Sequence, residues 1–141
     1  MKITLHELLI LNACDEQLNL FKALFGESVE LTEEIMRKHG AMFDVDWLAT
    51  RILSPQQRAD YEPKFQLLDA EYWTKRALAD AEYDAQRAMI NAKWNEKNAL
   101  KPSEYWDECI EAYTTYESKF YPVYVEHRTK LALIFLEVVN N

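Results

Sequence analysis

Glycine, histidine and cysteine are scarce in this chain of 141 residues, which contains two glycines, three histidines and two cysteines. Two glycines are too few for a fold with many tight turns or for a glycine-rich phosphate-binding loop. The two cysteines, Cys14 and Cys109, cannot build a disulfide framework and indicate a reducing compartment. Helices joined by few turns are therefore the favoured architecture.

The residues that usually carry chemistry are not grouped. His6, His39 and His127 lie far apart in the sequence, and none of them stands in a cluster with a cysteine. No glutamate precedes a histidine by three residues, which excludes the spacing of helical di-iron sites. Dinucleotide and phosphate-loop fingerprints are also missing. We therefore expect no metal, no cofactor, no catalytic residue and no enzymatic activity.

The chain has no excess of positive charge and no long apolar run. Its net charge is −8, and residues 1–50 hold nine acids against four bases. This balance disfavours direct binding of nucleic acid, which requires clustered Lys and Arg. The last apolar run, 131–139, is too short to cross a bilayer, and the N-terminal stretch lacks the apolar core of a signal peptide. The expected location is the cytoplasm.

Against this background, the second half of the chain repeats every eleven residues. Small-acid-aromatic triplets begin at residue 59, and later copies keep the spacing while losing the alanine and the acid. The copies are Ala59-Asp60-Tyr61, Ala70-Glu71-Tyr72, Ala81-Glu82-Tyr83, Ala92-Lys93-Trp94, Ser103-Glu104-Tyr105, Thr114-Thr115-Tyr116 and Val125-Glu126-His127. Eleven residues make three turns at 3.67 residues per turn, so each triplet returns to the same side of a long helix.

This period gives the first long helix two opposed faces. The small face is Ala70, Thr74, Ala77, Ala81, Ala85, Ala88, Ala92 and Ala99. The bulky face is Tyr61, Phe65, Leu68, Tyr72, Tyr83, Ile90 and Trp94, interrupted by Arg76 and Arg87. A small face admits another helix closely, whereas an aromatic face offers a large contact area. The two arginines either stack on the aromatic rings or contact an acidic partner.

Prolines divide the repeat region, 55–141. Pro63 and Pro122 are expected to kink or restart their helices, and Pro102 separates two segments of equal length, 63–101 and 103–141. We expect these segments to form an antiparallel hairpin, with its turn near 101–103, that buries both faces. One unbroken rod is the alternative. Acids followed by lysine four residues later predict stabilising ion pairs at Asp60/Lys64, Glu71/Lys75 and Glu126/Lys130.

Residues 1–54 are expected to form a small orthogonal bundle of four short helices, here called the head. Thr4 with Glu7 is typical of a capping box, and Asp15, Thr32 and Asp44 are candidate caps of the next three helices. Gly26 and Gly40 are expected to end the second and third helices, and 28–31 to be extended. Ser54-Pro55 with Gln57 then begins the first long helix. The predicted fold class is all-α.

Together, the head and the repeats resemble a group of small, uncharacterised bacteriophage and bacterial proteins. The likeness lies in the Ala-Glu-Tyr array and in a leader marked by Cys14, Phe21, Phe25-Gly26, Thr32, Asp46-Trp47 and Leu53. The resemblance covers most of the chain and implies no catalytic residue. It implies a small acidic protein that inhibits a host enzyme or defence system, acting in the host cytoplasm if a phage encodes it.

We therefore expect a non-enzymatic, protein-binding module, with an anti-CRISPR-like inhibitor of a bacterial defence complex as the specific form. The candidate contacts with the partner protein are Tyr72, Trp73, Tyr83, Trp94, Tyr105 and Trp106. Aromatic side chains of this kind are either binding anchors or core, and the sequence leaves both uses open. The alternative function is a structural or self-assembling helical protein that forms a homodimer without a foreign partner.

Overall fold

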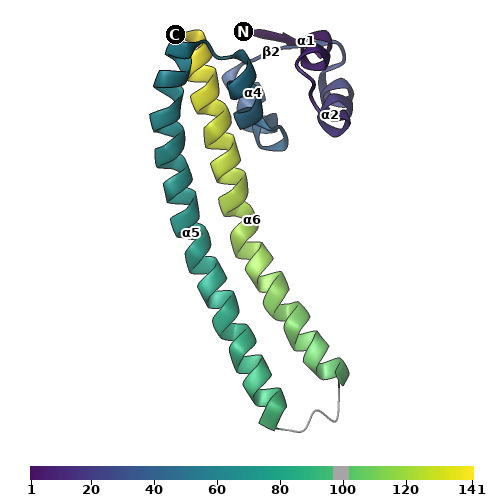
Figure 1. Cartoon of the computed structure of the whole chain (residues 1–141). Helices are drawn as coiled ribbons and strands as arrows, with labels where there is room; N and C mark the ends of the chain where they lie inside the picture. Colours follow the sequence, from purple (N-terminus) through teal and green to yellow (C-terminus); the bar gives the residue numbers. More distant parts are fainter. Residues whose placement is uncertain (97–101) are drawn as a thin grey trace. The chain divides into compact units, whose positions relative to one another are not determined.

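The computed structural model describes residues 1–96 and 102–141, except for the side chain of Glu96. Helices account for nearly all of its regular structure, which confirms the all-α fold class. The elements are β1 (Lys2–Thr4), α1 (Leu5–Ile10), α2 (Asp15–Phe25), β2 (Ser28–Glu30), α3 (Glu33–His39), the 3-10 helix η1 (Gly40–Met42), α4 (Val45–Ile52), α5 (Pro55–Glu96) and α6 (Pro102–Asn140), as drawn in Figure 1.

The chain divides into two compact units. Met1–Leu68 and Glu126–Asn141 form the first, here called the head unit, and Asp69–Val125 form the second, the hairpin unit. This division cuts across the boundary that the sequence pattern places after residue 54. The reason is that the start of α5 and the end of α6 supply core residues to the head unit, as described below.

Most of the expected helix ends are present. The Thr4 hydroxyl accepts from the Glu7 backbone N–H while the Glu7 carboxylate accepts from the Thr4 N–H, which completes the capping box of α1. The hydroxyl of Thr32 caps α3 and the carboxylate of Asp44 caps α4. One cap is wrong. Asp15 is the first residue of α2 rather than its cap, and Cys14 takes the cap position without a side-chain hydrogen bond.

A small sheet is the element that the sequence analysis missed. β1 pairs antiparallel with β2, and Ile3 lies opposite Val29 in the register. The extended segment was expected only at 28–31, because three residues at the start of the chain are too few to show an alternating pattern. The pairing closes the loop that follows α2, where Gly26 takes a left-handed backbone with φ 69°.

The core of the head unit is completed by the last turns of α6. Phe135 and Leu131 are the largest fully buried side chains, and they pack in one cluster with Val45 and Ala49 of α4. Polar contacts tie the two long helices together at this end. Gln57 Nε2 donates to the Val138 carbonyl at 3.3 Å. These contacts explain why both ends of the repeat region belong to the head unit.

Two of the three expected ion pairs form. Glu71 pairs with Lys75 at 2.8 Å, and Glu126 pairs with Lys130 at 2.7 Å. The third was wrong, because Lys64 Nζ pairs with Glu137 Oε1 on α6 at 2.7 Å instead of with Asp60. A partner on the neighbouring helix thus replaces the expected partner on the same helix.

The two long helices form an antiparallel hairpin, which rules out the unbroken rod. In the hairpin unit, Tyr72 of α5 contacts Phe120 of α6, and Trp94 contacts Tyr105, so the two helices run in opposite directions. Figure 1 shows α5 and α6 side by side. Pro63 and Pro122 both lie inside continuous helices and restart neither of them. The expected turn at 101–103 lies partly outside the described residues, and α6 begins at Pro102.

Only one of the two faces of α5 is buried. Tyr61, Leu68, Tyr72 and Trp94 of the bulky face are buried. The small face is exposed throughout its described length, at Ala70, Thr74, Ala77, Ala81, Ala85, Ala88 and Ala92; Ala99 lies outside the described residues. The expectation that the hairpin buries both faces was wrong. A two-helix hairpin covers one face of each helix, and burying the aromatic face removes more apolar area from water.

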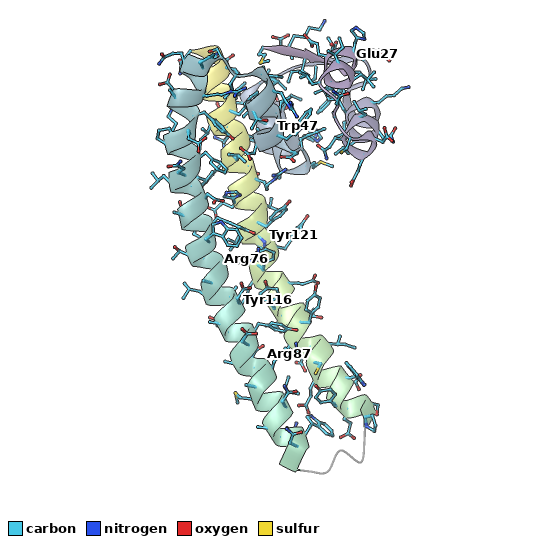
Figure 2. All side chains as sticks on the ribbon, in the orientation of Figure 1. Glu27, Trp47, Arg76, Arg87, Tyr116 and Tyr121 are labelled. Carbon is cyan, nitrogen blue, oxygen red and sulfur yellow. The ribbon has the colours of Figure 1, made fainter. Side chains whose placement is uncertain are left out.

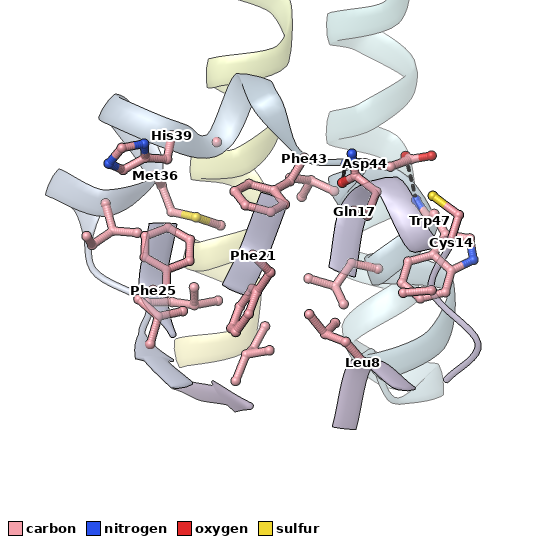
Figure 3. Close-up of a pocket in the computed structure, with 18 of the residues that line it drawn as sticks. Leu8, Cys14, Gln17, Phe21, Phe25, Met36, His39, Phe43, Asp44 and Trp47 are labelled. Atoms are coloured by element: carbon pink, nitrogen blue, oxygen red, sulfur yellow. Dashed lines mark hydrogen bonds between the residues drawn. The ribbon is translucent and has the colours of Figure 1, made fainter. Parts of the chain in front are cut away.

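The core of the head is not completely filled. A cavity of about 290 Å³ opens among α1, α2, α3 and α4, lined mainly by apolar side chains (Figure 3). The cavity is partly open to solvent rather than sealed, so it forms an accessible apolar hollow within the head.

Replacing Gly40 with alanine is expected to destabilise the head unit. A Cβ at this position would overlap the Cβ of Ala132 on α6, and overpacking of this kind costs about 1–3 kcal/mol. Urea unfolding followed by circular dichroism measures the change. The double variant Gly40→Ala/Ala132→Gly should recover part of the loss, because it restores the space. Equal stabilities of Gly40→Ala and the wild type would contradict this packing.

Tyr61→Phe is expected to leave stability unchanged or raise it by up to about 1 kcal/mol. The Tyr61 hydroxyl is buried, and no described residue bonds to it. Burial and the charges of Asp46 and Glu62 raise the pKa of this phenol, so it stays protonated. The matched variant is Tyr116→Phe, which loses a 2.6 Å hydrogen bond to Asp80 and should be less stable by about 1 kcal/mol. If Tyr61→Phe loses as much stability as Tyr116→Phe, the expected difference between an unbonded and a hydrogen-bonded hydroxyl is refuted.

Candidate partner-binding surface

The interior of the hairpin unit is built from aromatic rings of both helices. Tyr83 of α5 contacts Tyr113 and Tyr116 of α6 at ring-centroid distances of 6.2 Å and 5.0 Å. Tyr116 stacks on Phe120 at 5.6 Å with nearly parallel planes. Such ring pairs add about 0.5–1.5 kcal/mol each beyond the area they bury. This packing holds the two helices in register, so the side chains on the outer faces of the hairpin are attached to a rigid pair of helices.

The six residues predicted to bind a partner divide into three classes of burial. Tyr72 and Trp94 are buried, with 9% and 8% of their surface exposed, and Tyr83 and Tyr105 are half-buried. Trp73 and Trp106 are exposed, at 52% and 61%. The structure thus places four of the six in or beside the packing between the helices. The two tryptophans that follow a repeat tyrosine are the ones that a partner could reach.

The half-buried and buried members are also held by hydrogen bonds across the hairpin. Trp94 Nε1 donates to Glu108 Oε2 at 3.3 Å, and the Tyr105 hydroxyl donates to Asn91 Oδ1 at 3.0 Å. Each bond joins α5 to α6, so it stabilises the hairpin. In the free protein, the side chains of Trp94 and Tyr105 therefore have a structural role.

Trp106 belongs to an exposed row along α6. The exposed large apolar residues of this helix within the hairpin unit are Trp106, Ile110, Tyr113, Tyr121 and Tyr124. At about 100° per residue, all five lie within a sector of about 80° on one side of the helix. With a rise of about 1.5 Å per residue, the row extends for about 27 Å. Glu117 lies in the same sector between Tyr113 and Tyr121, so the row consists of two groups of exposed apolar residues. Exposed apolar residues are common singly, but several of them along one helical face are typical of an interaction site.

Trp73 of α5 lies on the same side of the hairpin as this row. It follows the inward residue Tyr72 by one position, as Trp106 follows the inward Tyr105. In an antiparallel helix pair, positions that follow the inward residues turn toward the same side of both helices. We call this surface the aromatic flank. It comprises Trp73 of α5 with Trp106, Ile110, Tyr113, Tyr121 and Tyr124 of α6.

Two arginines of α5 stack on aromatic rings, and one of them, Arg76, bridges the two helices. The guanidinium of Arg76 lies 5.1 Å from the ring centre of Trp73 and 5.3 Å from that of Phe120. Arg87 lies over the ring of Tyr83 at 5.9 Å. The first of the two uses expected for these arginines, stacking within the hairpin, is confirmed. Figure 2 shows Arg76 and Tyr116 between the two helices and Tyr121 on α6.

Two members of the aromatic flank, Trp73 and Tyr113, and the neighbouring inward residue Tyr116 donate hydrogen bonds to carboxylates. The Tyr116 hydroxyl donates to Asp80 Oδ1 at 2.6 Å, and that hydrogen bond raises the pKa of the phenol. The Tyr113 hydroxyl donates to Glu117 Oε1 at 2.8 Å, with the same effect on its pKa. Trp73 Nε1 donates to Asp69 Oδ2 at 2.9 Å. These bonds hold side chains that would otherwise lose rotamer freedom on binding, so the surface is preorganised.

The opposite flank of the hairpin has a different character. Two ion pairs cross it between the helices, Lys119 with Glu82 and Lys93 with Glu108. Its exposed apolar residues are Leu78 and Met89, which are separated by one repeat of eleven residues. Helical spacing places both on the other side of α5 from Trp73. The two flanks therefore differ in chemistry while sharing the same two helices.

Four members of the aromatic flank were not among the predicted contacts. Ile110, Tyr113, Tyr121 and Tyr124 lie outside the repeat triplets. The available signal was the successive intervals of four, three, eight and three residues that begin at Trp106, which mark one helical face. A second aromatic row on the inward face of α6 obscured that spacing.

In the ranges 1–96 and 102–141, no three His, Cys, Asp or Glu side chains gather closely enough to hold a metal ion. Within the same ranges, no helix has the length and apolarity to cross a membrane. Comparison of the chain with protein-family models, curated proteins and solved structures gave no match.

Alanine variants should separate the core from the exposed surface of the hairpin unit. Tyr72→Ala and Trp94→Ala remove buried rings and are expected to cost about 3–5 kcal/mol each. Trp73→Ala and Trp106→Ala remove rings that are more than half exposed, so a loss below about 1 kcal/mol is expected. Urea unfolding measures all four. A large loss for Trp106→Ala would show that this ring is covered in solution.

Proposed function

We propose that this chain is a non-enzymatic protein-binding module that contacts its partner through the aromatic flank. The observation that carries the proposal is the exposed row on α6, in which Trp106, Ile110 and Tyr121 each expose more than half of their surface. Tryptophan and tyrosine dominate the binding energy of many interfaces, because they bury a large area and lose little conformational entropy.

The construction beneath the flank supports this proposal. Its rings lie beside the aromatic packing between α5 and α6, and Tyr113 and Trp73 are hydrogen-bonded to carboxylates of their own helices. Side chains held in this way lose little freedom when a partner covers them. Because the exposed members are aromatic or aliphatic, an apolar or aromatic complement is the partner surface that fits.

The identity of the partner comes into the proposal through the resemblance to small phage and bacterial proteins. On that basis we assign the partner to a bacterial defence complex, which the chain would inhibit in an anti-CRISPR-like manner by occupying one of its surfaces. The net charge of −8 fits a mode of action through protein contacts. Self-assembly through the same flank is the competing function, and the experiment below separates the two.

The double variant Trp106→Ala/Tyr121→Ala is expected to lose its partner while keeping its fold. Both rings lie on the aromatic flank and are exposed, so their removal should weaken binding by at least about thirtyfold and leave the melting temperature nearly unchanged. The measurement is affinity purification of the tagged full chain from bacterial lysate with quantitative mass spectrometry, followed by titration of the retained protein. The mass of the free chain is measured across a concentration range in parallel.

The matched control is Leu78→Ala/Met89→Ala, which removes two equally exposed apolar side chains from the opposite flank. A stoichiometric partner retained by the wild type and by this control, but not by the flank variant, supports the proposal. In the other case, no other protein is retained, and the mass of the wild type and of the control rises with concentration while that of the flank variant does not. This result would assign the surface to self-assembly. Equal behaviour of both variants in all assays would refute a binding role for the aromatic flank.

A further inference from the structure

The head cavity has the composition of a binding site for a small apolar molecule. Aromatic and aliphatic side chains from four helices and the segment between them point into it, as Figure 3 shows. The apolar lining includes Leu8, Phe21, Phe25, Met36, Phe43 and Trp47. Small-molecule sites in proteins are typically concave, mostly apolar and supplied with a few polar groups. The aromatic flank lies in the other unit, so this site is separate from the proposed partner surface.

One wall of the cavity is fixed by hydrogen bonds. Gln17 Nε2 donates to the Met42 carbonyl at 3.4 Å, and Gln17 Oε1 accepts from the Asp44 backbone N–H at 3.0 Å. Asp44 Oδ1 in turn accepts from the Trp47 N–H at 3.1 Å. These bonds connect α2 to the start of α4, and those among Gln17, Asp44 and Trp47 lie at one end of the cavity in Figure 3. The wall is therefore a built feature of the head that holds the cavity open.

At the other end, the lining contains an unused polar atom. His39 lies opposite Gln17 and Trp47 in Figure 3 and contacts the ring of Phe25 at a centroid distance of 5.4 Å. Its Nδ1 is buried, and no described residue bonds to it. An imidazole nitrogen can donate or accept a hydrogen bond, and leaving it unpaired in an apolar environment is unfavourable. Because this nitrogen has almost no accessible surface, a ligand in the cavity would meet the ring of His39 rather than this atom.

The charges of the head restrict the ligand further. Residues 1–50 hold nine acids and four bases, and the cavity lining itself includes Asp44. Asp15 and Glu16 directly follow the lining residue Cys14. Arg128 approaches Asp44 at 3.9 Å and donates to the Phe43 carbonyl, and Arg37 and Lys38 lie between the lining residues Met36 and His39, so these bases offset part of this charge. An anionic ligand would meet like charges, whereas a neutral or cationic ligand would not.

We infer that the head cavity binds a small apolar molecule that is neutral or cationic. The volume of about 290 Å³ equals that of about ten liquid water molecules. It accommodates a ligand of about ten to twenty non-hydrogen atoms, such as a bicyclic aromatic amine or alcohol. Binding fills the unoccupied part of the core and therefore stabilises the head unit against unfolding.

The test uses the neutral dye N-phenyl-1-naphthylamine, whose fluorescence rises in an apolar site, titrated into the full chain. The filling variant is Ala13→Leu, because Ala13 is a small residue of the cavity lining. It should bind the dye at least about tenfold more weakly than the wild type, with an equal or higher melting temperature. The matched control Ala81→Leu adds the same side chain at an exposed position of α5 and should bind as the wild type does. The anionic relative 8-anilinonaphthalene-1-sulfonate should bind more weakly than the neutral dye.

Methyl NMR of the wild type keeps the inference testable if Ala13→Leu fails to fold. Addition of the neutral dye should shift the methyl signals of Ile3, Leu8 and Ile35, which line the cavity, and leave those of Ile90 on α5 unchanged. Absence of dye binding to the wild type would overturn the inference. Equal binding to the wild type and a folded Ala13→Leu, or methyl shifts confined to residues outside the cavity, would overturn it as well.

Discussion

The period of eleven residues is the constraint on which the long helices depend. Because eleven residues complete three turns, an aromatic residue repeated at this interval stays on one side of a helix without supercoiling in the left-handed sense of a heptad repeat. Tyr72, Tyr83 and Trp94 of α5 occupy that position and meet rings of α6. The inward row fixes which residues turn outward, and the exposed row on α6 therefore follows from the packing of the buried one.

Local signals in the sequence were sufficient for most helix boundaries. The polar side chains of Thr4, Thr32 and Ser54 bond to backbone groups three residues ahead, and such contacts depend only on neighbouring residues. The errors arose where distant residues decide. β1 forms because β2 lies beside it, and Lys64 pairs with Glu137 because α6 passes close to the start of α5. Neither contact leaves a pattern within a short window of sequence.

The candidate surface was predictable only in part, for a related reason. Periodicity sorts residues into faces, but it does not say which face a neighbour covers. For α5, either the aromatic face or the alanine face could pack against α6. The aromatic face is the one buried, because its rings remove more apolar area from water. For α6 both competing faces carry aromatic residues. The sequence therefore does not tell which tyrosine packs inward; the folded hairpin shows that Tyr116 lies inward and Tyr121 outward. Trp73 and Trp106 were identified because each directly follows a repeat tyrosine.

The same repeat makes the hairpin a modular structure whose length can change in fixed steps. One copy lengthens each helix by about 16 Å and returns the next copy to the same orientation. Because rings of α5 pack against rings of α6, gain or loss of one copy keeps the contacts only when the opposite helix changes by the same eleven residues. Insertions in one arm alone would shift every pair beyond them. Viable length variants of such a protein are therefore expected to differ by paired copies, about twenty-two residues in all.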